Sequence, residues 1–90
     1  MTDYDPFGRT PSRPPPPREL LFEFYRDRDH SRWLCELIDH GAVYGVEAQF
    51  FQNEQLFAAH TFPPYLDPTR TSRAMAIAWA DETRKVLENV

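Results

Sequence analysis

The sequence has one cysteine, Cys35, and three glycines among its 90 residues. A single cysteine excludes an internal disulfide, so the chain is not a disulfide-stabilised secreted scaffold. No apolar run approaches the roughly 20 residues that a membrane-spanning helix needs. The first residues, MTDYDPFGRTP, have neither a basic start nor an apolar segment, so we expect no signal peptide and a cytoplasmic location.

Motifs for catalysis and cofactor binding are also missing from the sequence. There is no cofactor fingerprint, no nucleophile motif, and neither the C-x-x-C nor the H-x-x-x-H spacing of many metal sites. We therefore expect no enzymatic activity, no cofactor and no metal. The net charge of −4 argues against broad electrostatic binding to nucleic acid or to an anionic membrane.

Proline is concentrated at the start of the chain, where six of the nine prolines precede residue 18. Residues 1–18 have little to bury, so they predict a disordered tail, and residues 19–90 predict one small domain. The run RPPPPR, Arg13–Arg18, favours polyproline II because each ring fixes φ. It is either a ligand for the aromatic groove of a protein partner or a stiff spacer, and we favour the spacer.

The most informative stretch is Val43–Phe62, VYGVEAQFFQNEQLFAAHTF. Two alternating runs rich in aromatic residues flank Asn53-Glu54, and asparagine tolerates positive φ, so the pattern predicts a hairpin with a two-residue turn. In that register Glu47 lies opposite His60 on one face, and Phe50 takes part in the other, apolar face.

Two further strands are predicted upstream, over Glu19–Arg26 and Arg32–Asp39, with a turn at His40-Gly41. Short connections of this kind predict an antiparallel meander of three to four strands. Glu23 would lie beside Glu36, an unfavourable pair, so an irregular edge is the alternative for the first strand. The apolar face comprises Phe22, Phe24, Trp33, Cys35, Leu37, Tyr44, Val46, Ala48, Phe50, Phe57 and Ala59.

The residues after Pro63-Pro64 predict a helix that runs to Glu88, because this segment is rich in good helix formers. Asp67 followed by Pro68 offers one start and Thr71-Ser72 offers a second. The apolar stripe of the helix comprises Met75, Ala76, Trp79, Ala80, Thr83, Val86, Leu87 and Val90.

Trp79, at the centre of this stripe, should pack on the small residues Ala48 and Ala59 of the sheet. The expected fold class is therefore α+β, a β-meander covered on one face by a C-terminal helix, in the order ββββα.

The outer face of the sheet is predicted to carry more apolar surface than a solvated sheet needs. The predicted interaction face comprises Tyr25, Leu34, Ile38, Phe51, Leu56 and Phe62. We therefore expect a non-enzymatic protein-interaction or assembly module. It should form a homodimer or small homo-oligomer through this face or through an edge strand.

Two alternatives stay open. Glu47 and His60 form a polar site in which a carboxylate could orient an imidazole for acid–base or metal chemistry, although an exposed cross-strand pair is the simpler interpretation. The basic residues of the helix, Arg70, Arg73, Arg84 and Lys85, are candidate contacts for nucleic acid. Acidic residues interleave with them, which favours a solvated helix.

Three pieces within and just beyond Trp33–Ala80 carry a resemblance: W-x-C-E-L, Y-G-V-E-A-Q-F-F and A-x-x-W-A-D-E-T-R. On these pieces the chain resembles small uncharacterised bacterial proteins. The resemblance implies a bacterial origin and no particular activity.

Overall fold

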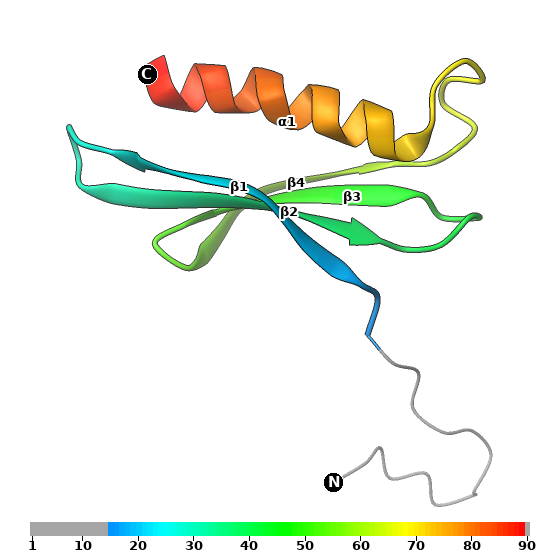
Figure 1. Cartoon of the computed structure of the whole chain (residues 1–90), viewed down its shortest axis with the longest axis horizontal. Helices are drawn as coiled ribbons and strands as arrows, with labels where there is room; N and C mark the ends of the chain where they lie inside the picture. Colours follow the sequence, from blue (N-terminus) through cyan, green and yellow to red (C-terminus); the bar gives the residue numbers. More distant parts are fainter. Residues whose placement is uncertain (1–14, 90) are drawn as a thin grey trace, which may run out of the picture.

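The computed structural model describes residues 15–89. Its strands are β1 (Arg18–Arg26), β2 (Ser31–Asp39), β3 (Val46–Gln52) and β4 (Gln55–Phe62), in one antiparallel sheet of order β1-β2-β3-β4. Helix α1 (Ser72–Asn89) follows and covers one face of the sheet (Figure 1). The predicted α+β meander is confirmed, and β1 begins at Arg18, a residue that was predicted to belong to the tail. Residues 1–14 of the predicted tail, and Val90 of the predicted stripe, lie outside the described residues.

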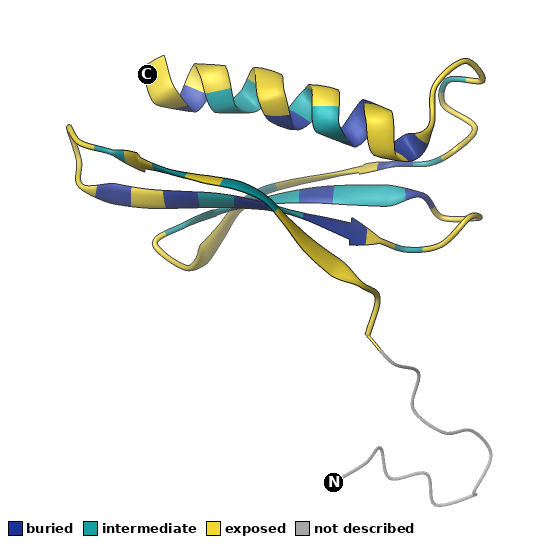
Figure 2. Cartoon of the chain, viewed as in Figure 1, coloured by how far each residue is buried: buried dark blue, intermediate teal, exposed yellow. Residues whose placement is uncertain are grey.

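The core lies between the sheet and α1, as the alternation of the strands predicts (Figure 2). The odd-numbered residues of β2 from Trp33 to Leu37 and the pair Ala48 and Phe50 of β3 are each at most 2% exposed. The helix contributes four buried apolar residues, Met75, Ala76, Ala80 and Leu87. Burying a side chain of the size of Phe50 stabilises the fold by roughly 1.5–3 kcal/mol.

Trp79 packs against the core that includes Ala48, but not on Ala59, which pairs with Gln49 on the outer face. Its ring lies toward β4, 5.6 Å from the ring of Phe50 and 5.5 Å from that of His60, and it is only partly buried. Small residues lie on both sides of this contact, where Ala48 of the sheet and Ala76 and Ala80 of the helix are fully buried.

The β3–β4 turn is the two-residue turn predicted at Asn53 and Glu54, which have φ of 48° and 72°. Pairing begins in the predicted register, with Phe51 opposite Leu56. Phe57 is then an extra residue in β4, a β-bulge that shifts the pairing by one. Beyond it, each residue of β4 lies on the face opposite to the predicted one, because side chains alternate along a strand.

The bulge overturns two predictions about β4. Glu47 lies opposite Thr61 rather than His60, and His60 lies on the helix side of the sheet, stacked on Trp79. Phe62, predicted on the outer face, is instead part of the core at 9% exposure.

The connection between β2 and β3 is longer than the predicted two-residue turn. Leu37 pairs with Ala48 rather than Tyr44, a slip of four residues. Tyr44, predicted in the core, is 69% exposed in the loop between the two strands. An even slip leaves every paired side chain on its predicted face, so the core of β2 and β3 is as predicted.

The pairing of β1 also differs from the prediction. Phe24 lies opposite Trp33, and an irregularity at Leu21 shifts the register again toward the start of the strand. Glu23 and Glu36 consequently do not face each other, so the unfavourable pair expected from the sequence does not form.

Two further predicted core residues of β4 are exposed. Phe57 is 54% exposed, although its ring still contacts that of Trp33 at 4.9 Å. Ala59 is exposed as well, and Ala58 packs against the core in its place. On the helix, Val86 is 58% exposed.

Helix α1 begins at the second of the two predicted starts. Thr71 is the N-cap, and its Oγ1 accepts a hydrogen bond from the backbone N of Ala74 at 3.1 Å. Asp67 organises the preceding turn instead, where its Oδ1 accepts hydrogen bonds from the backbone N and the hydroxyl of Thr69.

Two glycines in the β2–β3 loop give a matched test of how closely this loop approaches the end of β4. Gly41 and Gly45 both have positive φ, 95° and 91°, but a Cβ on Gly45 would collide with the carbonyl of Phe62 while Gly41 faces open space. We expect Gly41→Ala to lower the free energy of unfolding by about 1 kcal/mol and Gly45→Ala by about 3 kcal/mol or more. Urea denaturation measures both, and equal losses would contradict the close approach.

Candidate functional site

The face of the sheet opposite α1 is not covered by any described helix or strand (Figure 1). Pairing arranges its side chains in three rows that run from β1 to β4. The rows are Glu23, Leu34, Phe51 and Leu56; then Leu20, Glu36, Gln49 and Ala59; and then Arg18, Ile38, Glu47 and Thr61. The first row is mainly apolar and the third is mainly polar, so the two ends of this outer face differ in chemistry.

The predicted interaction face is only partly brought together. Leu34, Phe51 and Leu56 are adjacent in the first row, and Tyr25 lies beyond that row at 58% exposure. Ile38, by contrast, is 1% exposed, and the core residue Phe62 is on the other side of the sheet. A smaller outer-face patch therefore remains, composed of Tyr25, Leu34, Phe51 and Leu56.

A chain of hydrogen bonds crosses the polar end of the outer face. Arg18 Nη1 donates to Glu36 Oε1 at 2.8 Å and to Gln49 Oε1 at 3.1 Å. Gln49 Nε2 donates to Glu47 Oε2 at 3.0 Å, and Glu47 Oε1 lies 2.7 Å from His40 Nε2. These five residues form the outer-face polar chain.

Glu47 is the centre of the outer-face polar chain. Burial acts to raise the pKa of Glu47, but hydrogen bonds from His40 and Gln49, together with the charges of His40 and Arg18, outweigh burial and lower the pKa. The arrangement can hold an imidazole in one orientation for proton transfer. The sequence pointed to Glu47 but paired it with the wrong histidine, because His40 was placed in a tight turn.

The residues for other chemistry are not assembled. Within residues 15–89, no group of three or more His, Cys, Asp or Glu side chains is arranged to hold a metal ion. Burial raises the pKa of Cys35 to about 12, which keeps this fully buried thiol protonated and unreactive.

The outer-face polar chain ends at a groove of about 1090 Å³, which His40 helps to line. The groove lies where β2 ends and β3 begins. Val43, Tyr44 and Tyr65 line it and are 72%, 69% and 79% exposed. No sequence signal marked it, because its walls come from separate loops.

The two edge strands of the sheet differ in composition. β1, RELLFEFYR, carries four charged residues and the irregularity at Leu21. β4, QLFAAHTF, contains no Asp, Glu, Lys, Arg or Pro, yet six of its eight residues are exposed. Charges, prolines and bulges are the usual means by which an edge strand avoids pairing with another chain. Of these, β4 has only the bulge at Phe57.

The four basic residues predicted to contact nucleic acid are each paired with a carboxylate. The partners are Asp67 for Arg70 at 3.2 Å, Glu19 for Arg73 at 2.7 Å, Glu88 for Arg84 at 3.3 Å and Glu82 for Lys85 at 3.7 Å. The guanidinium of Arg84 also lies over the ring of Phe22 at 4.8 Å. Neutralised cations attract phosphate weakly, so these contacts do not favour nucleic-acid binding.

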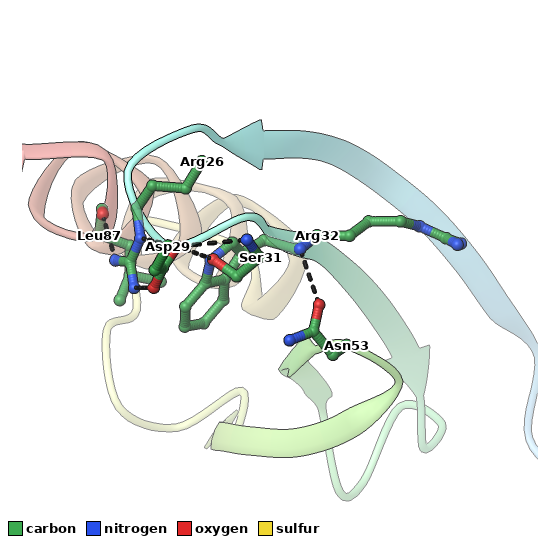
Figure 3. Close-up of polar contacts among 7 residues, drawn as sticks. Arg26, Asp29, Ser31, Arg32, Asn53 and Leu87 are labelled. Atoms are coloured by element: carbon green, nitrogen blue, oxygen red, sulfur yellow. Dashed lines mark hydrogen bonds and ion pairs between the residues drawn. The ribbon is translucent and has the colours of Figure 1, made fainter.

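Another polar cluster ties the β1–β2 turn to the end of the helix (Figure 3). Arg26 donates to the carbonyl of Leu87 at 2.8 Å and to Asp29 Oδ2 at 2.6 Å. Ser31 Oγ donates to Asp29 and accepts from Trp33 Nε1 at 2.7 Å. Hydrogen bonds from Arg26 and Ser31 hold the pKa of Asp29 well below its usual range. Because its members satisfy one another, we assign this cluster a structural role.

Comparison with known proteins adds no family to this description. No protein-family model, curated protein or solved structure matches the chain. The resemblance to small bacterial proteins therefore stays an expectation. Among the described residues, no helix has the length and apolar character to cross a membrane.

The Glu47 contacts predict a pH-dependent contribution to stability. A carboxyl whose pKa is lowered on folding stabilises the protein above the unfolded pKa, near 4.5, and that contribution is lost as pH falls through the folded pKa. We expect Glu47→Gln to lower the free energy of unfolding by about 1 kcal/mol at neutral pH.

Urea denaturation at about pH 7 and about pH 3 measures this difference, which should be smaller at the lower pH because that pH is below the unfolded pKa. Glu54→Gln, at an exposed turn position, is the control and should have little effect at either pH. An equal loss for Glu47→Gln at both pH values would contradict the role of its charge.

Proposed function

We propose that this protein is a non-enzymatic assembly module that forms a homodimer by pairing β4 with β4 of a second copy. The carrying observation is the composition of β4, an exposed edge strand of eight residues without a charged side chain or proline. Unpaired backbone groups along such an edge are a template for another strand. Antiparallel pairing of two identical edges is a self-complementary, closed arrangement.

Side chains on both faces of β4 support pairing with a second copy. Leu56, on the outer face, is 57% exposed, and Phe57, which contacts Trp33, is 54% exposed. In an antiparallel pair both would lie opposite the far end of the second copy's β4, and pairing would remove part of their exposed apolar surface from water. A domain of this size gains a larger buried fraction when it dimerises, which favours self-association.

The outer-face patch extends this surface away from the edge. Its first row ends at Leu56, so the apolar side chains Leu34 and Phe51 continue directly from β4. At the far end of the patch, Glu23 and Arg32 lie 3.8 Å apart. An apolar centre with a rim of mixed charge is a common form of protein interface.

A cytoplasmic location belongs to the same proposal. The one cysteine, Cys35, is fully buried with a free thiol, so the fold needs no oxidising compartment for disulfide formation.

A lysine in the centre of β4 tests the proposal. Ala59 is exposed in the strand, and Ala78 is exposed on α1, so Ala59→Lys and Ala78→Lys add the same charge at two places. We expect Ala59→Lys to weaken the dimer at least tenfold, because pairing would bring two lysines together, and Ala78→Lys to leave it unchanged. Sedimentation equilibrium measures the association, and a wild-type chain that stays monomeric up to millimolar concentration would sink the proposal.

Hydrogen exchange separates an edge dimer from one formed through the outer-face patch. Edge pairing should slow the exchange of β4 amides as concentration rises, while β1 amides are unaffected. A dimer that Phe51→Glu dissociates without any concentration-dependent protection in β4 would assign the interface to the outer-face patch instead.

A further inference from the structure

The most exposed apolar side chains of the protein gather at one place. Among the large hydrophobic residues of the described chain, Tyr65, Val43 and Tyr44 are the three most exposed, at 79%, 72% and 69%. All three line the groove at the end of the sheet. Two come from the β2–β3 loop and one from the segment after β4, which lie at the same end of the sheet (Figure 1). Scattered exposed residues need no explanation, whereas a cluster in a groove indicates a binding surface.

The loop that carries Val43 and Tyr44 is held in one conformation by hydrogen bonds. His40 N donates to the carbonyl of Gly45 at 2.9 Å, and Gly45 N donates to that of Gly41 at 2.8 Å. The imidazole of His40 is held by Glu47 at 2.7 Å. The outer-face polar chain therefore holds one residue of the groove lining, His40, through its contact with Glu47.

The walls of the groove suit a proline-rich ligand. Tyr44 and Tyr65 present broad aromatic surfaces, and Pro63 lies with them in the lining. Segments in polyproline II conformation bind such aromatic grooves because the extended helix is already formed and little entropy is lost. Asp39 also lines the groove and is exposed, so a ligand that carries arginine would gain a charge partner.

We propose that the groove binds the N-terminal segment of the same chain, residues 1–14, as an intramolecular proline- and arginine-containing ligand. The first described residues already contact the groove, because Pro15 and Pro16 form part of its lining. The carbonyl of Pro17 accepts a hydrogen bond from the backbone N of Asp39 at 3.1 Å, which anchors this entry point.

The chemistry of the segment matches the groove. Residues 1–14 contain three prolines, and their arginines Arg9 and Arg13 complement Asp39. A ligand joined to its site by a short stretch of chain is present at a millimolar effective concentration, so weak contacts suffice to hold it. Occupancy by this segment would exclude weaker proline-rich peptides from the groove.

A spin label on the N-terminal segment tests the proposal in the full chain. Thr2→Cys supplies the attachment site, because the native Cys35 is fully buried. The background is Ala59→Lys, so that pairing through β4 does not contribute. We expect the label to broaden the amide signals of Val43 and Gly45, and the double variant Tyr44→Ser, Tyr65→Ser to restore both signals. Both tyrosines are exposed, so the variant keeps the fold, which its other amide signals verify.

Val86→Ser is the matched control, because Val86 is 58% exposed on α1 and does not line the groove. It should leave the broadening unchanged. A mixture of isotope-labelled chain without the spin label and spin-labelled chain without the isotope shows whether the bound segment comes from the same molecule. Broadening in this mixture would mean that the segment of a second copy occupies the groove, which would overturn the intramolecular site. Broadening that is absent, or that survives the loss of both tyrosines, would overturn the groove as the binding site. If the β4 dimer proved not to form, the expected outcomes of this experiment would be the same, so the two proposals can fail separately.

Discussion

One helix can cover only one face of a four-stranded sheet, and this constraint determines which surfaces of the protein remain available. Helix α1 buries its small and apolar residues against the inner face, where Ala76 and Ala80 allow the close contact. The outer face and the edge at β4 are left without a partner among the described elements. The outer face and the β4 edge are candidate surfaces because of that division, since the core uses most of the inner face.

The bulge at Phe57 shows where sequence reasoning fails in this fold. The observed pairing of β2 with β1 and β3 is shifted from the predicted register. Where the shift is an even number of residues, each side chain stays on its predicted face, so alternation alone predicted most of the core correctly. A bulge shifts the register by one and exchanges the faces. In β4 the residues around it, Phe57 and Ala58, are both apolar, so the pattern fits either register equally well. The site prediction for Glu47 and His60 was lost for that reason.

The helix start and the groove illustrate two further limits. Both Asp67 and Thr71 are good caps by propensity, so propensity does not decide between them, and the observed cap is Thr71. The groove could not be predicted at all, since Tyr44 and Tyr65 are far apart in sequence and the loop between β2 and β3 was expected to be a short turn. In contrast, the turn at Asn53 was predictable because asparagine tolerates positive φ.

The edge of β4 and the groove are adjacent, but a ligand would bind each of them through different groups. Strand pairing needs backbone donors, and Pro63, directly after the last residue of β4, has none, so the edge available for pairing ends at Phe62. The same proline contributes to the lining of the groove. Pro63 thus marks the boundary between the β4 edge, which has backbone hydrogen-bonding groups, and the groove, which is lined by tyrosine and proline side chains. A second copy along β4 and a proline-rich segment beside Tyr65 would accordingly use different chemistry, and the occupation of one surface need not displace the other.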